Sequence, residues 1–249
     1  MIVCRSKWEI DRIKRACDVV SGVLALLRRS AVPGRTTREL DRLAEDYIRG
    51  QGAVPAFKGY RGYPASICTS VNQQVVHGIP SDYALKEGDI LGLDAGAVVD
   101  GYYGDAAVTV AIGAVTPELT RLLDTTRAAL MRGIDQARPG NRVYDISHAI
   151  QSHAEGHGYS VVRDFVGHGI GTRLHEDPQV PNYGEPGKGK RLQAGMVLAI
   201  EPMVNTRGYE VRLLTDNWTV VTADGGYSAH FEHSVAVTGN GPCVLTEWE

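Results

Sequence analysis

The chain has 249 residues, of which 43% are hydrophobic and 22% are charged, so it is long enough to bury a large core as one domain. Its formal net charge of −3 gives no basic field that would indicate a nucleic-acid or membrane partner, and no apolar run is long enough to cross a bilayer. The N-terminus lacks the apolar core of a secretory signal and the four cysteines form no CxxC pair, so we expect a protein of the reducing cytoplasm.

Apolar residues spaced three and four apart predict four helices, at residues 6–29, 36–49, 116–137 and 143–156. Thr36 and Glu39 form a capping box at the start of the second helix. Thr116 caps the third, where Pro117 takes the first helical position at no cost in hydrogen bonds.

Six runs that alternate, or that are rich in Val, Ile and Thr, predict strands: SICTSV (66–71), DILGLDAGAVV (89–99), DAAVTVAIG (105–113), MVLAIEPMV (196–204), NWTVVTADG (217–225) and HFEHSVAVTG (230–239). The order of two helices followed by strands therefore occurs twice. Similar short segments recur in the two parts and pair three sets of residues: Asp94 with Glu201, His77 with His168, and Asp105 with Glu232. We interpret residues 1–249 as one domain with an internal pseudo-repeat, whose halves are approximately 1–115 and 116–249.

Two aspartates flank a turn between adjacent predicted strands. Asp100-Gly101 is a strong hairpin signal, and a hairpin folded there sets Asp94 opposite Asp105 to within a residue or two. Carboxylates about 5 Å apart among apolar side chains repel each other and lose solvation, so such a pair shares a proton or holds a metal.

Glu201 and Glu232 stand at similar strand ends, and His168 lies in the segment VGHGIGTRLHEDPQV (166–180). Four carboxylates and one imidazole carry too much negative charge for one divalent ion and suit two ions of Mn, Fe, Co or Zn. A mononuclear phosphatase or a simple acid–base hydrolase is also compatible with the carboxylates alone. A nucleotide loop at GHGIG is disfavoured, because the spacing is not GxGxxG and Pro178 stands where a helix should continue.

Five longer motifs together resemble one family, the type I methionine aminopeptidases of the pita-bread fold. The motifs are SICTSVNQQVVHGIP, DILGLDAGAVVDGYYGDAAVT, VGHGIGTRLHEDPQVPNYG, AGMVLAIEPM and NWTVVTADGGYSAHFEHSVAVT. The resemblance covers nearly the whole chain. It implies an α+β fold in which a pseudo-two-fold mixed or antiparallel sheet is covered by helices and holds a dinuclear metal site at its centre.

The resemblance also assigns residues. The metal ligands would be Asp94, Asp105, His168, Glu201 and Glu232, and the catalytic residues would be Glu201 as general base with His77 and His175 facing the substrate. The methionine side chain would lie among Tyr60, Tyr63, Cys68, Leu174 and Trp218. A Na or K ion would bind near Asn72 and Ser228.

Three features depart from the family pattern. Leu174 stands where an aromatic residue is common, and His230 stands where glutamine is common. Because alternate strand residues share a face, His230 is expected beside Glu232. The absence of an N-terminal zinc-binding extension and of a long insertion between His168 and Glu201 indicates the minimal bacterial form.

The implied activity is co-translational removal of the N-terminal methionine from nascent proteins, with a small second residue preferred and transient association with the ribosome. The first alternative is an X-Pro dipeptidase or aminopeptidase P, which share the fold and the five ligands but usually carry an additional N-terminal domain. The second is a non-enzymatic binding module of the same fold, which is disfavoured because all five ligands are present.

Overall fold

The computed structural model describes residues 2–247. Within this range the four α-helices begin and end within two residues of the predicted bounds: α1 (Lys7–Ser30), α2 (Thr37–Gly50), α3 (Pro117–Asp135) and α4 (Val143–Gly156). A short 3-10 turn, η1, spans Tyr60–Gly62. None of the helices in the described range has the length and apolar character needed to cross a lipid bilayer.

Side chains at the helix ends explain where the first three helices begin. The predicted capping box of α2 is present, because Thr36 and Glu39 bond reciprocally to each other's backbone N–H. Ser6 and Glu9 form a second capping box at the start of α1. The Thr116 hydroxyl accepts a backbone N–H from the first turn of α3.

The strands are mostly short and lie between these helices. They are β1 (Val54–Pro55), β2 (Ile67–Val71), β3 (Gln74–Val76), β4 (Ile90–Val99), β5 (Tyr102–Ala111), β6 (Ser160–Val161), β7 (Gly167–Gly169), β8 (Glu176–Val180), β9 (Val197–Ile200), β10 (Met203–Asn205), β11 (Val211–Leu213), β12 (Val220–Thr222), β13 (Ser228–His230), β14 (His233–Thr238) and β15 (Gly241–Val244). Two groups of strands matter most for the site: β1-β4-β2 with β5 on β4, and β15-β14-β9-β7-β8. The smaller groups are β13-β10-β6 and β11-β12-β3, and every pairing between the named strands is antiparallel.

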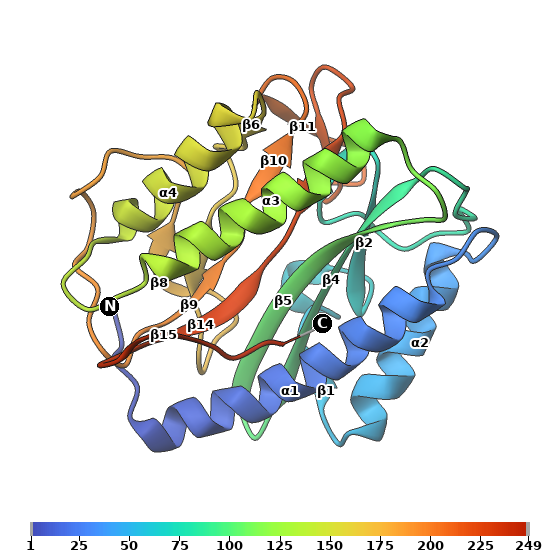
Figure 1. Ribbon diagram of the computed structural model, residues 1–249. Helices are drawn as coiled ribbons and strands as arrows, with labels where there is room; N and C mark the ends of the chain where they lie inside the picture. Colours follow the sequence, from blue (N-terminus) through green and yellow to red (C-terminus); the bar gives the residue numbers. More distant parts are fainter. Residues whose placement is uncertain (1, 248–249) are drawn as a thin grey trace.

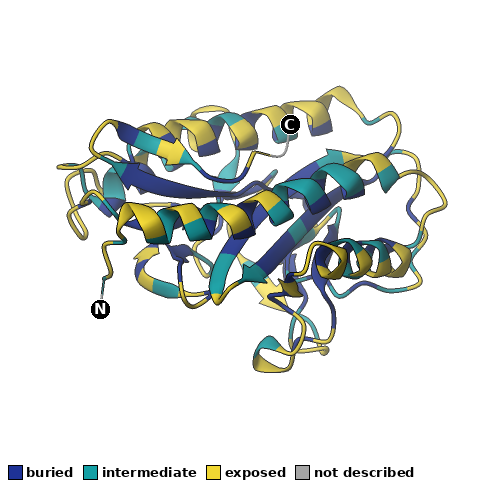
Figure 2. Ribbon diagram, turned by 90° about the horizontal axis from the view of Figure 1, so that it is seen from below, coloured by how far each residue is buried: buried dark blue, intermediate teal, exposed yellow. Residues whose placement is uncertain are grey.

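The helices pack on the long strands. α1 lies over β4 and β5, α3 lies over β9, β10 and β13, and α2 and α4 pack beside α1 and α3 respectively (Figure 1). The helices are exposed along their outer faces while the strands beneath them are buried (Figure 2). α1 comes very close to β5, since a Cβ added at Gly104 would lie 2.6 Å from the backbone nitrogen of Cys17. Any side chain at position 104 would therefore push the helix off the strand.

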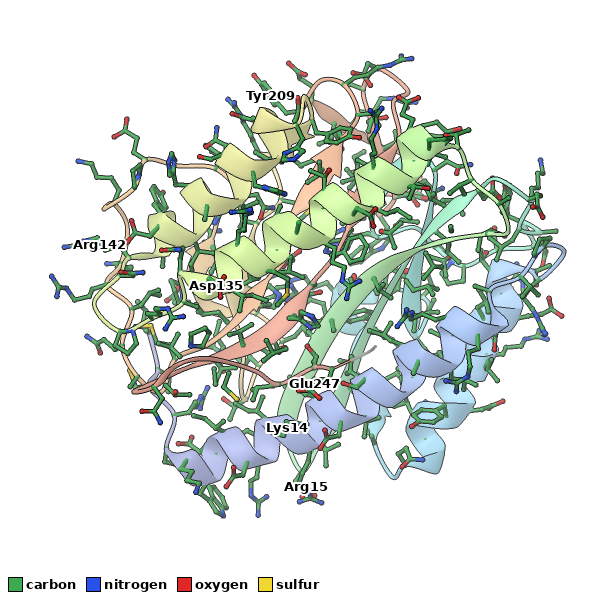
Figure 3. All side chains as sticks on the ribbon, viewed as in Figure 1. Lys14, Arg15, Asp135, Arg142, Tyr209 and Glu247 are labelled. Atoms are coloured by element: carbon green, nitrogen blue, oxygen red, sulfur yellow. The ribbon has the colours of Figure 1, made fainter. Side chains whose placement is uncertain are left out.

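The β4–β5 hairpin folds at the predicted turn. Its two loop residues, Asp100 and Gly101, have φ angles of 50° and 79°, as a two-residue type I′ connection requires. Asp100 also accepts a hydrogen bond from Arg15 at 2.9 Å. Arg15 extends from the outer side of α1 (Figure 3). The turn is thus tied to the helix that covers the hairpin.

The run 196–204 was expected to form one strand, but the structure divides it into β9 and β10. The break falls at Glu201 and Pro202. Proline has no N–H to donate to a ladder, and the chain changes sheets there, since β9 pairs with β7 and β14 whereas β10 pairs with β6 and β13. The break leaves Glu201 outside both strands.

Candidate metal centre

The β4–β5 hairpin places two aspartates near each other on one face. Asp94 faces Ala107 and Asp105 faces Gly96, so the two carboxylates are offset by two residues in the register. This offset lies within the range expected from the turn. Ala107 then accepts a hydrogen bond from the backbone N–H of Glu232 at 2.9 Å. This contact joins the hairpin to the segment before β14.

The second half of the chain supplies the other acidic groups in the same way. β9 and β14 pair at Ile200 and His233, so the residues that follow β9 and precede β14, Glu201 and Glu232, are neighbours across the sheet. β7 pairs along the other edge of β9 and contributes His168. The five predicted ligands therefore come from five different strands or strand ends.

The side chains of these residues converge. Ligand atoms of Asp105, His168 and Glu232 all lie within 4.8 Å of one another. The Nε2 atom of His168 is 3.8 Å from Oδ2 of Asp105 and 3.5 Å from Oε1 of Glu201. Its Nδ1 atom is 2.9 Å from the carbonyl oxygen of Gly169. Because a carbonyl can only accept, Nδ1 carries the proton and Nε2 presents its lone pair to the carboxylates.

The cluster is buried and its charges interact unfavourably. Asp105, His168 and Glu232 are 5%, 6% and 2% exposed. Burial raises the pKa of Asp94 to about 7 and that of Glu201 to about 8. Burial and the neighbouring carboxylates raise the pKa values of Asp105 and Glu232 well above the ordinary range. Burial lowers the pKa of His168 to about 3, so its imidazole is neutral at pH 7.

This donor set fits divalent metal ions. Within residues 2–247, the buried Oδ1 atoms of Asp94 and Asp105 have no hydrogen-bond partner. Buried carboxylate oxygens without partners are costly, and a cation supplies both the missing contact and the missing charge. Oxygen donors with one neutral imidazole nitrogen suit Mn, Fe, Co or Zn.

The raised carboxyl pKa values predict how the metal-free protein responds to pH. Its stability is expected to fall until the pH has risen through about 7 to about 8. A group whose pKa is raised on folding stabilises the folded state below its unfolded pKa, and this contribution is lost as the pH passes the folded value, here about 7 for Asp94 and about 8 for Glu201. The buried histidines do not oppose this trend above pH 7, because their rings are neutral there in both the folded and the unfolded protein. Thermal unfolding in the presence of a chelator would measure the trend, and a melting temperature that rises over this window would contradict it.

His230 is a further buried polar group at the centre. Its Nε2 atom lies 3.6 Å from Oε2 of Glu201, and burial lowers the pKa of the ring. The strand pattern predicts a position beside Glu232, and that neighbour stays a prediction. β13 ends at His230, before Glu232.

A cavity of about 270 Å³ opens onto the carboxylates. Its lining includes all five residues predicted for the methionine pocket, namely Tyr60, Tyr63, Cys68, Leu174 and Trp218. It also includes three residues that the sequence did not predict, Phe57, Arg61 and Phe165. Burial raises the pKa of the Cys68 thiol well above its usual value, so Cys68 acts here as an apolar wall.

His77 and His175 both line this cavity. The Nδ1 atom of His175 is 2.8 Å from the Tyr60 hydroxyl, and its ring centroid is 4.3 Å from that of His168. His77 has a left-handed backbone with φ of 60° and packs edge-to-face on Phe165. Burial lowers the pKa of His77 to about 4 and also lowers that of His175, so both rings are neutral at pH 7. The structure thus brings both predicted histidines to the cavity, and Tyr60 contacts one of them directly.

The residues predicted for a Na or K ion lie outside the lining of the cavity, as do the histidines not yet described. Asn72 and Ser228 are adjacent, because the Ser228 N–H donates to the Asn72 carbonyl at 3.0 Å. Among the other histidines, His148, His153 and His157 belong to the α4 region, and His233 is buried with Nδ1 2.9 Å from the Thr246 hydroxyl.

The chain is similar to known proteins both in sequence and in fold. Residues 11–239 match Metallopeptidase family M24. The chain is 52% identical to the methionine aminopeptidase of Clostridium acetobutylicum, with 99% of each chain covered. It is similar to the crystal structure of methionine aminopeptidase from Rickettsia prowazekii, with a TM-score of 0.98, 41% identity, and coverage of 99% and 100%. It shares the fold of the Pyrococcus furiosus prolidase with a TM-score of 0.82 at 23% identity, covering 99% of this chain and 66% of the prolidase.

Proposed function

The chain belongs to metallopeptidase family M24, and we propose that within this family it removes the N-terminal methionine from peptides and proteins. Two observations support this function over the X-Pro alternative. The chain is 52% identical to a methionine aminopeptidase over nearly its full length, whereas the likeness to prolidase extends to the fold alone. The observation that carries the proposal is the apolar cavity that ends at a buried cluster of carboxylates.

We propose that Asp94, Asp105, His168, Glu201 and Glu232 hold two divalent ions of the Co, Mn, Fe or Zn type. When bound, such ions activate a water molecule for hydrolysis and polarise the scissile carbonyl. The buried oxygen atoms without partners and the repulsion among four carboxylates support this assignment.

The side chains around the ions would perform three tasks. Glu201 would accept a proton from the attacking water, because its carboxylate lines the cavity beside the other proposed ligands. His175 would donate a hydrogen bond to the carbonyl oxygen as negative charge develops there. In this role the Tyr60 hydroxyl would donate to Nδ1 and so keep the proton of the neutral ring on Nε2, the atom that must donate. His77 would contact the scissile amide nitrogen.

The shape of the cavity supports the proposed specificity. Tyr63 and Trp218 pack edge-to-face with centroids 5.0 Å apart, and together with Leu174 they offer an apolar lining of suitable size for a thioether side chain. His77 packs against Phe165 and Trp218, which narrows the route for the second residue. A small second residue is therefore expected.

The experiment that tests the function compares two classes of peptide. Chelator-treated protein should be inactive, and adding Mn, Fe, Co or Zn under anaerobic reducing conditions should restore cleavage of Met-Gly-Met-Met. An X-Pro dipeptide and a peptide with an acetylated N-terminal methionine serve as controls. Preferential cleavage of the X-Pro substrate would replace the proposal with its alternative.

Leu174 provides a test of the pocket. It is 3% exposed in the cavity lining, so Leu174→Phe should reduce the space for the first side chain. The ratio of kcat/KM for ethionine, which is one methylene longer, relative to methionine is expected to fall by about tenfold, which is the order that one methylene commonly contributes in an apolar pocket. An unchanged first-residue profile in this variant would show that Leu174 does not contact the substrate side chain.

Three more detailed expectations from the sequence remain predictions. They are action on nascent chains at the ribosome, a cytoplasmic location, and a Na or K ion near Asn72 and Ser228. The adjacency of Asn72 and Ser228 supports the last of these.

A further inference from the structure

A buried ion pair joins the segment before α1 to the loop that carries His175. The Nη2 atom of Arg5 lies 2.7 Å and 2.6 Å from the two carboxylate oxygens of Glu176, and the side chains are 6% and 5% exposed. Glu176 directly follows His175 and begins β8. The Arg5–Glu176 pair touches neither the cavity nor the proposed ligands, so its place in the fold needs another explanation.

The same carboxylate closes the loop between β7 and β8. Oε1 of Glu176 accepts hydrogen bonds from the backbone N–H groups of Thr172 and Arg173, at 2.9 Å and 3.1 Å, and from the Thr172 hydroxyl at 3.2 Å. A buried anion with this many donors fixes the backbone around it. The loop from 171 to 176 is therefore wrapped around Glu176.

Arg5 reaches this carboxylate through space that a glycine leaves open. A Cβ added at Gly171 would lie 2.4 Å from Nη2 of Arg5. The carbonyl of Gly171 also accepts the N–H of Tyr103 at 2.8 Å, and the N–H of Arg5 donates to the carbonyl of Gly195 at 2.7 Å. The segment before α1, the loop and β5 are thus held to one another.

We propose that Arg5 and Glu176 are positioning residues for His175. They hold the loop 171–176 so that the imidazole remains between the Tyr60 hydroxyl and the His168 ring. This inference rests on the proposed aminopeptidase function, in which His175 donates to the scissile carbonyl. Neither residue touches the substrate, so their effect is on the geometry of the donor alone.

The test replaces Arg5 with alanine. The kcat for Met-Gly-Met-Met is expected to fall by about 10- to 100-fold, the loss typical when a supporting residue or a shift of about 1 Å disturbs a catalytic group. KM and metal content per chain should stay close to wild type. Arg5→Lys should retain an intermediate kcat, and added methylguanidinium should restore part of the activity of Arg5→Ala. Arg38→Ala removes the exposed pair that Arg38 forms with Asp82, and this matched control should turn over normally.

Amide hydrogen exchange gives a readout that needs no activity. The amides of Thr172 and Arg173 should exchange faster in Arg5→Ala than in the wild type or in Arg38→Ala. A wild-type protein that does not cleave the peptide overturns the proposed function. An active wild type whose Arg5→Ala and Arg5→Lys variants keep full kcat overturns the positioning role. A loss of kcat in Arg5→Ala that follows a parallel loss of metal, with no rescue by methylguanidinium, also overturns it.

Discussion

Asp105→Asn is expected to reduce peptide hydrolysis by at least about 100-fold and to lower the metal content of the protein. The change keeps the shape of the side chain but removes its charge. Replacing a residue that merely supports a metal ligand typically lowers metal affinity or activity by about 10- to 100-fold. Replacing a proposed ligand should lower them by more. Asp105 is 5% exposed and its Oδ2 atom lies 3.8 Å from Nε2 of His168, so no solvent-exposed group can take its place.

The control for this variant lies on the same hairpin. Asp100→Asn alters an exposed carboxylate in the turn, where it pairs with Arg15, and should leave both metal content and turnover unchanged. Unfolding of the metal-free proteins separates a chemical effect from a folding defect. Asp105→Asn removes a buried carboxyl group whose ionisation is opposed by its surroundings, so the metal-free variant should be at least as stable as wild type near pH 8. Full metal content with normal turnover in Asp105→Asn would refute the assignment of this residue as a ligand.

His175→Ala is expected to lower kcat by about 10²- to 10³-fold, or about 2.7–4 kcal/mol, while metal content and fold are retained. The reason is that a donor aimed at the developing oxyanion stabilises the transition state more than the bound substrate. His175 contacts Tyr60 through Nδ1 and lines the cavity. KM should therefore change little.

His168→Ala provides the comparison, because its Nε2 atom faces the carboxylates and its removal should lower metal content together with turnover. His157→Ala, on the exposed surface near the end of α4, should have no effect on either measurement. Metal per chain, kcat and KM for all three variants on Met-Gly-Met-Met decide the assignment. If His175→Ala loses the metal and His168→Ala keeps it, the two roles are reversed.

Much of the fold follows from local signals in the sequence. The capping residue Thr36, the proline at 117 and the Asp100-Gly101 turn act over a few residues, so they fix helix starts and the β4–β5 register without reference to the rest of the chain. The division of 196–204 into two strands was not predicted from the apolar run. The run alone does not show that the chain changes sheets at Pro202, which depends on pairing with strands that are distant in sequence.

Some features of the candidate site follow from local signals in the sequence, whereas others depend on tertiary contacts. The nearness of Asp94 and Asp105 follows from one hairpin, whereas their approach to Glu232 depends on a single bridge at Ala107 for which the sequence has no local signal. The cavity residues Phe57, Arg61 and Phe165 were missed for this reason, since each lies outside the main strands and is placed by tertiary contacts. The sequence does not predict the ion pair of Arg5, because its partner Glu176 is far away along the chain.

The origin of the proposed ligands in both halves of the chain has a mechanical consequence. Asp94 and Asp105 precede α3, whereas His168, Glu201 and Glu232 follow it. Ions held by this set would join distant parts of the polypeptide in the folded state, and because the unfolded chain does not assemble the site, their binding free energy would stabilise the folded state. The cations proposed for hydrolysis would then also stabilise the fold. Removing them with a chelator should lower the stability of the whole molecule and not only the order of its active centre.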